Sequence, residues 1–84
     1  MELKNKFEEY TEEEFTTLVK KIFVAEGTEA YANNLILNFI KVSEHPKRSD
    51  LIFYPEDKNI TPEGVVAQVK AWRKANGKPG FKAS

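Results

Sequence analysis

The first helical pattern in the chain is the feature that most restricts its fold. Thr11 and Glu14 have the spacing of a capping box, in which each side chain accepts a hydrogen bond from the other residue's backbone N–H. The apolar residues that follow recur at intervals of three and four, which places them on one face of a helix. These residues are Phe15, Leu18, Val19, Ile22 and Phe23. Gly27 predicts that this helix ends near Ala25 or Glu26.

A second helical segment extends from Thr28, a candidate N-cap, to about Ser43, where Glu44-His45-Pro46 interrupts it. Its apolar residues form two stripes. The first stripe contains Tyr31, Leu35, Phe39 and Val42, and the second contains Ala32, Ile36 and Ile40. Two explanations are open for the second stripe: the helix is central and packed on two sides, or this stripe contacts another protein.

The last helical segment begins at Thr61, with Pro62 at the first helical position, and stops at Asn76-Gly77. Its core side is predicted to consist of Val65, Val66, Val69 and Trp72. Phe81 is an apolar residue that can anchor the irregular tail. Apart from one short apolar run at residues 51–54, no segment has the pattern of a strand. The chain is therefore predicted to be a small all-α bundle that forms a single domain over residues 1–84.

A short run of large apolar side chains, Leu51-Ile52-Phe53-Tyr54, lies between the second and last helices. Prolines on both sides limit it to a short helical turn or tight connector, with Ser49 able to cap its start. A segment this short cannot bury four large side chains on one side. We therefore expect part of Phe53 and Tyr54 at the surface, where aromatic rings beside Asp50 suit a protein-binding hot spot.

The 84 residues include 13 basic and 13 acidic residues, so the formal net charge is zero. The charges are unevenly spread, because acids crowd the start of the first helix and only bases follow Glu63. These bases are Lys70, Arg73, Lys74, Lys78 and Lys82. The favoured explanation is that acids and bases complement the dipoles at helix starts and ends. The alternatives are an acidic face for a basic partner and a basic tail for nucleic acid.

The residues give little support for catalysis, a metal or a cofactor. The chain has no cysteine, and its single histidine, His45, is more typical of a hydrogen-bonding group at a helix end than of a ligand. No glycine-rich phosphate loop is present. We expect no catalytic residues, no metal site and no cofactor. The start lacks a signal-peptide pattern and no segment approaches membrane-spanning length, which predicts a cytoplasmic protein without membrane contact.

Six short motifs occur in order from one end of the chain to the other. They are Met1-Glu2-Leu3-Lys4-Asn5, Tyr10-Thr11-Glu12 with Glu14-Phe15, Glu44-His45-Pro46, Ser49-Asp50-Leu51-Ile52-Phe53-Tyr54-Pro55, Pro62-Glu63-Gly64-Val65-Val66 and Ala71-Trp72-Arg73-Lys74-Ala75-Asn76-Gly77-Lys78-Pro79-Gly80-Phe81-Lys82. In this combination the chain resembles the immunity proteins of DNase colicins and S-type pyocins. The resemblance implies a distorted four-helix bundle with a very short third helix.

The same resemblance implies a function. Family members bind the nuclease domain of a cognate bacteriocin beside its HNH-type active site and block DNA access, so we expect a 1:1 heterodimer and a monomer when free. The shared hot spot would comprise Ser49, Asp50, Phe53, Tyr54 and Pro55. The family has two adjacent tyrosines here, so Phe53 lacks one phenolic hydroxyl. Partner specificity would reside in Glu29, Ala32, Asn33, Ile36 and Ile40 of the second helix.

Three features depart from the family's pattern. The chain is neutral where members are usually acidic, Ile40 stands where glutamate is frequent, and Lys47-Arg48 replaces a small or acidic turn. Either the cognate nuclease presents an unusually apolar, less basic surface to the second helix, or the sequence is a redesigned member. Two other functions are considered: a small basic-tailed helical nucleic-acid-binding domain, and a self-association module that uses Ile36 and Ile40.

Overall fold

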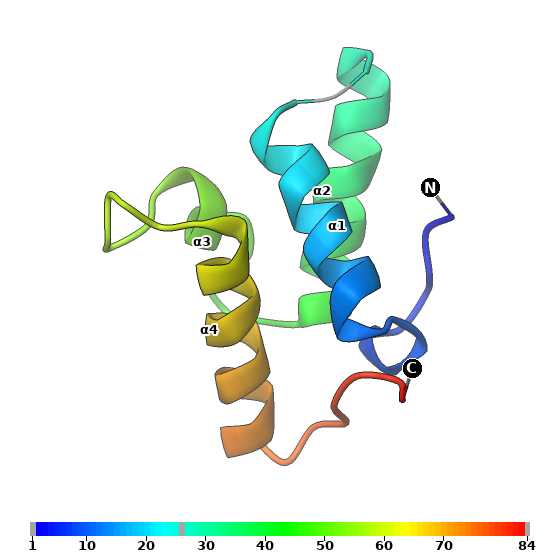
Figure 1. The fold of residues 1–84 in the computed structure, drawn as a ribbon, viewed down its shortest axis with the longest axis vertical. Coiled ribbons are helices and arrows are strands. Elements are labelled where there is room, and N and C mark those ends of the chain that lie inside the picture. The colour runs from blue at the N-terminus through cyan, green and yellow to red at the C-terminus, as the bar shows by residue number, and fades with distance from the viewer. Residues whose placement is uncertain (1, 26, 84) are drawn as a thin grey trace.

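The computed structural model describes residues 2–25 and 27–83, and every regular element in these residues is helical. The elements are the 3-10 turn η1 (Phe7–Glu9), α1 (Glu12–Phe23), α2 (Glu29–Ser43), α3 (Asp50–Phe53) and α4 (Pro62–Ala75). α1 packs against both α2 and α4, while the short α3 lies at one side of the bundle (Figure 1). The predicted all-α bundle with a very short third helix is confirmed.

Helix α1 begins as the sequence predicts but ends earlier. Thr11 Oγ1 accepts from Glu14 N at 3.1 Å, and Glu14 Oε1 accepts from Thr11 N at 2.9 Å. The helix ends at Phe23, not at Ala25, because Ala25 turns into the left-handed region with φ of 50°. The alternative end at Glu26 lies outside the described residues.

One residue of the predicted apolar face of α1 is not in the core. Phe15, Leu18, Val19 and Ile22 are buried, whereas Phe23 is 36% exposed. Phe23 lies at the margin of the stripe, about 80° around the helix from Phe15, and no later turn of α1 covers it. Phe23 therefore belongs to the predicted apolar face but not to the buried core.

The stripes of α2 have different degrees of burial. Leu35, Phe39 and Val42 are buried. Tyr31, Ala32, Ile36 and Ile40 are half-buried, and both isoleucines pack against the core. The second stripe thus takes part in packing and still keeps some exposed surface. Thr28 caps the helix by accepting from Tyr31 N at 3.1 Å, as predicted.

Helix α4 starts at the predicted cap, where Thr61 Oγ1 accepts from Gly64 N at 3.0 Å. Its valines are buried as expected, but Trp72 is only half-buried, with its ring 5.0 Å from that of His45. Arg73 takes the interior position instead, at 1% exposure. Arg73 continues the line of Val65 and Val69 at intervals of four, and this end of the helix faces carbonyl acceptors that suit a guanidinium better than an indole.

The N-terminal segment, to which the sequence assigned no element, supplies part of the core. Phe7 stacks on Phe81 with ring centroids 4.3 Å apart, and Lys82 N donates to Tyr10 O at 2.8 Å. The tail is therefore anchored by Phe81, as predicted. Tyr10 is fully buried; its hydroxyl donates to Asn38 Oδ1 and accepts from Lys4 N. We call Phe7, Tyr10, Arg73 and Phe81 the terminal junction.

Among residues 2–25 and 27–83, none of the helices combines the length and the apolarity needed to cross a bilayer.

Candidate partner-binding surface

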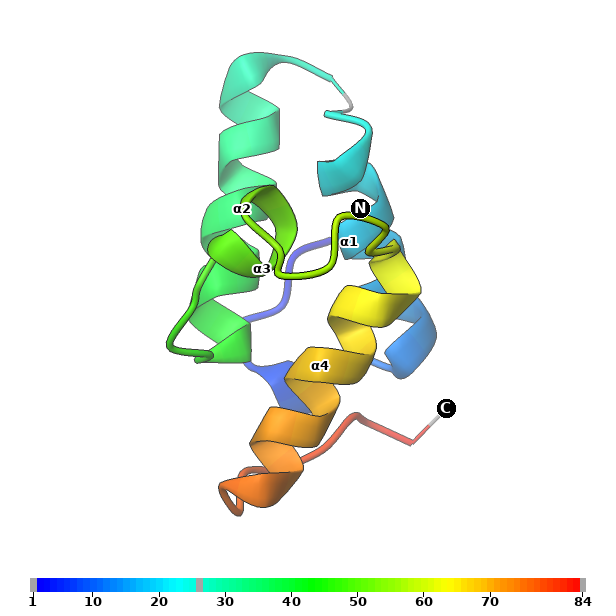
Figure 2. The same ribbon diagram turned by 90° about the vertical axis from the view of Figure 1, so that its left-hand side faces the viewer.

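Helix α3 divides its four large side chains between the core and the surface. Leu51 and Ile52 belong to the buried core, while Phe53 is 49% exposed and Tyr54 is 80% exposed. The prediction that both aromatics keep exposed surface is confirmed. Figure 2 shows α3 turned toward the viewer, level with the middle of α2. The two buried residues anchor the turn that presents the two exposed rings.

Backbone hydrogen bonds hold α3 in place without a side-chain cap. Ser49 O accepts from Ile52 N at 2.9 Å and from Phe53 N at 3.0 Å, and Asp50 O accepts from Tyr54 N at 2.9 Å. The prediction that Ser49 caps α3 through its side chain was wrong. An N-cap residue normally has an extended backbone, whereas Ser49 is already helical with ψ of −9°, and its hydroxyl forms no capping hydrogen bond.

The remaining hot-spot candidates differ in exposure. Asp50 is exposed, whereas Ser49 and Pro55 are half-buried at the two ends of the segment. Lys47 and Glu56 form an ion pair of 2.6 Å that joins the turn before α3 to the loop after it. The hydrogen bond and charge of Lys47 hold the pKa of the Glu56 carboxyl below its usual range. The exposed part of the candidate hot spot is therefore Asp50, Phe53 and Tyr54.

The candidate specificity residues lie beside the buried stripe of α2, on the exposed and half-buried part of the helix. Glu29 and Asn33 are exposed, and Ala32, Ile36 and Ile40 are half-buried. Ile36 and Ile40 pack against the same core that contains Leu51 and Ile52 of α3. Both predicted groups of partner-binding residues are thus supported by the same buried core.

Leu37, which was not predicted to be part of the site, is 62% exposed on α2. Leu37 follows Asn33 by four residues and lies on the outward side of the helix next to Ile36. A signal was present, because Leu37 is apolar yet belongs to neither stripe. It extends the exposed apolar area on this helix.

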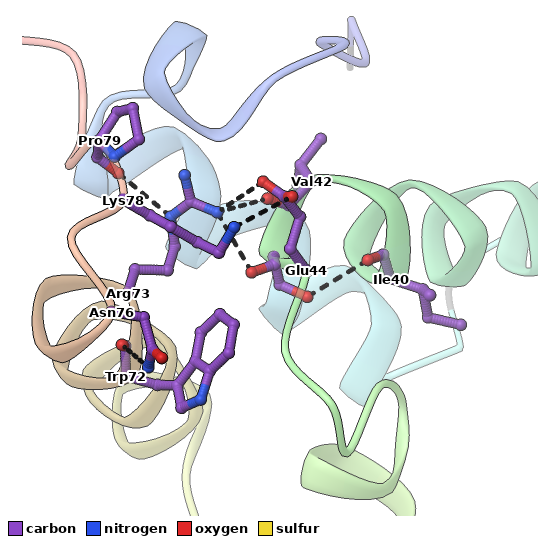
Figure 3. Close-up of polar contacts among 9 residues, drawn as sticks. Ile40, Val42, Glu44, Trp72, Arg73, Asn76, Lys78 and Pro79 are labelled. Atoms are coloured by element: carbon purple, nitrogen blue, oxygen red, sulfur yellow. Dashed lines mark hydrogen bonds and ion pairs between the residues drawn. The ribbon is translucent and has the colours of Figure 1, made fainter.

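Three of the five basic residues near the C-terminus have partners within the protein. Arg73 is buried, and its Nη1 donates to Val42 O, Ser43 O and Glu44 Oε1, each at 3.2 Å (Figure 3). Its guanidinium carbon lies 4.2 Å from the centre of the Phe7 ring. Lys70 pairs with Glu12 at 2.8 Å, and Lys78 pairs with Glu44 at 3.4 Å. The assignment of Arg73 to a nucleic-acid-binding surface was wrong, because its donors are used inside the protein.

Charges in this region serve the fold. The hydrogen bond from Arg73, followed by the charge of Lys78, holds the pKa of the Glu44 carboxyl below its usual range. Acids stand in the first turns of α1 and α4, and bases stand in their last turns. This arrangement confirms the prediction that the uneven charge distribution complements the helix dipoles.

His45 acts as a hydrogen-bonding group at the end of α2, as predicted. Its Nδ1 accepts from Lys47 N at 3.0 Å. Burial, followed by the charge of Lys47, lowers the pKa of His45. In the part of the chain that the structure describes, no three histidine or carboxylate side chains gather as a metal ion would require.

Comparisons with known proteins agree with this geometry. Residues 7–75 match the family model described as colicin immunity protein / pyocin immunity protein. The Pyocin-S2 and Pyocin-S1 immunity proteins of Pseudomonas aeruginosa are 45% and 44% identical to this chain over 86 residues, covering 96% of it and 99% of each relative.

Two solved structures are also similar. The pyocin AP41 DNase-immunity complex contains a chain with a TM-score of 0.88 and 41% identity, covering 96% of this chain and 100% of that one. The mutant nuclease domain of pyocin S8 with its cognate immunity protein gives a TM-score of 0.86 and 39% identity, covering 95% and 100%. The family match, the near-complete coverage and the shared fold show that this chain belongs to the colicin and pyocin immunity protein family.

Proposed function

We propose that this chain binds and inhibits the nuclease domain of a cognate DNase bacteriocin in a 1:1 complex. Family membership supports the proposal, as do the related structures, which are complexes of pyocin nucleases with their immunity proteins. The observation that carries it is the exposure of Phe53 and Tyr54 on a turn anchored in the core by Leu51 and Ile52. Two aromatic rings are thus presented to a partner by a backbone that is already held in place.

The size of these rings makes them strong candidates for binding anchors. An aromatic side chain buries ~150–250 Å². At ~25 cal/mol per Å², complete burial of a fully exposed ring contributes up to about 4–6 kcal/mol before the costs of association. Tyr54, at 80% exposure, keeps most of this contribution for a partner, and Phe53, at 49%, keeps about half. Because hydrogen bonds to Ser49 O already hold the turn, little backbone order remains to be lost on binding. Asp50, Phe53 and Tyr54 are therefore proposed as the hot spot, with Ser49 and Pro55 supporting it.

Helix α2 is proposed to select among nucleases. Its candidate residues combine a charge, an amide and apolar groups, so a wrong charge or shape on the partner would weaken binding. The residues are Glu29, Ala32, Asn33, Ile36 and Ile40, with Leu37 added by its exposure. Because Ile36, Leu37 and Ile40 are apolar, the cognate nuclease is expected to present an apolar patch to this helix.

The proposed mode of inhibition is occlusion, with the immunity protein beside the active site and in the path of DNA. Members of the family are inhibitors, and this chain is not an enzyme. Since its formal net charge is zero, it would exclude DNA by bulk more than by charge repulsion. The association rate should also depend less on salt than that of acidic relatives. We place the protein in the cytoplasm, as a monomer when free.

The test is a binding panel of purified DNase-bacteriocin nuclease domains that includes those of pyocins AP41 and S8. Each domain is titrated with the chain, and DNA cleavage is measured in the same mixtures. Tight binding to one domain, with its cleavage abolished at one equivalent, is the expected result. Absence of both binding and inhibition across the panel at micromolar concentrations would count against the proposal.

A further inference from the structure

Arg48 has a backbone conformation that arginine rarely adopts. Its φ is 50°, in the left-handed region that disfavours residues with a Cβ atom. The other non-glycine residues with positive φ, Ala25 and Glu44, lie just past the ends of α1 and α2, where this conformation commonly terminates a helix. Arg48 follows no helix. Its strain therefore has no explanation in helix termination.

Hydrogen bonds on both sides of Arg48 impose this conformation. Arg48 N donates to His45 O at 3.0 Å, and Asp50 N donates to Lys47 O at 2.9 Å. The turn leads directly into α3, so Arg48 cannot relax without displacing the start of that helix. A glycine would adopt the same φ without strain. The backbone of the turn thus gives no reason for an arginine at this position. The reason must lie in what the Arg48 side chain does.

The charge of Arg48 has no counterion among residues 2–25 and 27–83. Its side chain is exposed and forms no ion pair or hydrogen bond with any residue that the structure describes. Lys47, the preceding residue, is paired with Glu56 at 2.6 Å. The turn therefore carries one neutralised cation and one free cation. We call Arg48, Asp50, Phe53 and Tyr54 the α3 edge.

We propose that Arg48 pairs with an acidic side chain of the cognate nuclease domain and selects for nucleases that carry it. This inference rests on the function proposed above. A nuclease surface that binds DNA is expected to be basic, and it would repel a cation placed beside the aromatic anchors. Arg48 is compatible with binding only where a carboxylate lies opposite, and a guanidinium matches a carboxylate with two parallel hydrogen bonds.

Arg48 would then act in two directions. It strengthens binding to the nuclease that has the carboxylate, and it weakens binding to those with a neutral or basic group at the same place. This assigns part of the specificity to the turn before α3, outside α2. It also accounts for the strain at this position, because the gain on binding compensates for a local loss in the free protein.

The experiment uses four variants of the whole chain. Arg48→Gly and Arg48→Asn remove the charge and relieve the strain, since both residues accept positive φ. Arg48→Lys keeps the charge without the forked donors. Lys74→Ala is the matched control: it removes one exposed charge from the end of α4, which both ribbon views place far from α3 (Figures 1 and 2). Melting temperature and Kd are measured for each variant against the nuclease panel.

We expect Arg48→Gly and Arg48→Asn to melt at the same or a higher temperature and to bind the cognate nuclease about tenfold more weakly. Their discrimination against the other nucleases should fall, Arg48→Lys should be intermediate, and Lys74→Ala should bind as the wild type does. Unchanged cognate affinity in the glycine and asparagine variants would overturn the inference, as would an equal loss in Lys74→Ala. If the wild-type chain binds no nuclease, the proposed function itself fails, and the inference fails with it.

Discussion

The terminal junction and the α3 edge each contain an arginine, a tyrosine and phenylalanine, but in opposite environments. Tyr10 and Arg73 in the junction are at most 1% exposed, and their polar groups bond to other parts of the protein. Tyr54 is 80% exposed and Arg48 is free of ion pairs within the described residues. The comparison teaches that neither tyrosine nor arginine marks a binding surface by itself. What separates the two regions is whether the protein supplies partners for these side chains.

The difference has a structural cause. At the junction, the end of α2, the end of α4 and both terminal segments meet, so carbonyl groups and aromatic rings surround each side chain. Helix α3 has four residues and buries only Leu51 and Ile52. The rest of its surface has nothing in the protein to cover it. Changes in the junction should therefore affect folding, and changes at the α3 edge should affect binding.

Substitution of Arg73 by methionine should have the largest effect. The variant leaves the buried carbonyls of Val42 and Ser43 without a donor, so we expect a loss of about 3 kcal/mol in the free energy of unfolding. Urea denaturation monitored by circular dichroism measures this loss. Arg73→Lys, which keeps the charge and loses the fork, should lose less. An unchanged denaturation midpoint in Arg73→Met would show that these bonds contribute nothing net.

Tyr54→Ala is the corresponding change at the α3 edge. It should weaken binding to the cognate nuclease by more than ~2 kcal/mol, roughly a factor of 30 in Kd. Because Tyr54 is exposed, the free energy of unfolding should change by less than about 0.5 kcal/mol. Calorimetric titration and urea denaturation measure the two quantities on the same samples. A variant that binds as tightly as the wild type would exclude Tyr54 from the hot spot.

Removal of one hydroxyl sharpens the comparison. Tyr10→Phe leaves Asn38 Oδ1 and Lys4 N without their partner, so stability should fall by about 1–2 kcal/mol while nuclease affinity is unchanged. Tyr54→Phe is the matched control and should leave stability unchanged, because its hydroxyl bonds to no described residue. Equal stability losses in the two variants would contradict the contrast between the regions.

A pH effect at His45 should be the smallest of the four. Burial, and then Lys47, lower its pKa in the folded protein, so the unfolded chain takes up the proton more readily. The contribution of neutral His45 is therefore complete above about pH 6.5 and decreases as the pH falls through the folded pKa. Protonation also removes the acceptor for Lys47 N. We expect the urea midpoint to fall slightly between pH 7.5 and pH 5.5 in the wild type but not in His45→Asn. An equal fall of the midpoint in both proteins would refute this prediction.

Features with a local cause could be predicted from the sequence. Thr11, Thr28 and Thr61 each bond an amide three residues ahead, so their capping depends on a few neighbouring residues and was found correctly. The exposure of Phe53 and Tyr54 followed from length alone, because a single turn has too little buried surface for four large side chains.

Features that depend on distant segments were missed or assigned wrongly. Trp72 and Arg73 are neighbours that point about 100° apart around α4, so only one of them can occupy the interior beside Val65 and Val69. The sequence favoured the indole for this position. The carbonyls of Val42 and Ser43, thirty-one and thirty residues away, make the guanidinium the better occupant. Tyr10 became a core residue because Asn38, 28 residues away, accepts from its hydroxyl. No local pattern contains these partners.

The sequence by itself determined the helices, their starting points, the family and the turn that presents two aromatic rings. These depend on backbone hydrogen bonds, apolar periodicity and residue identity, which are all readable along the chain. Tertiary structure alone decided that Tyr10 and Arg73 are buried and that Arg48 has no ion pair within the described residues. That choice depends on whether acceptors and rings from distant segments converge on a side chain, and only the folded chain brings them together.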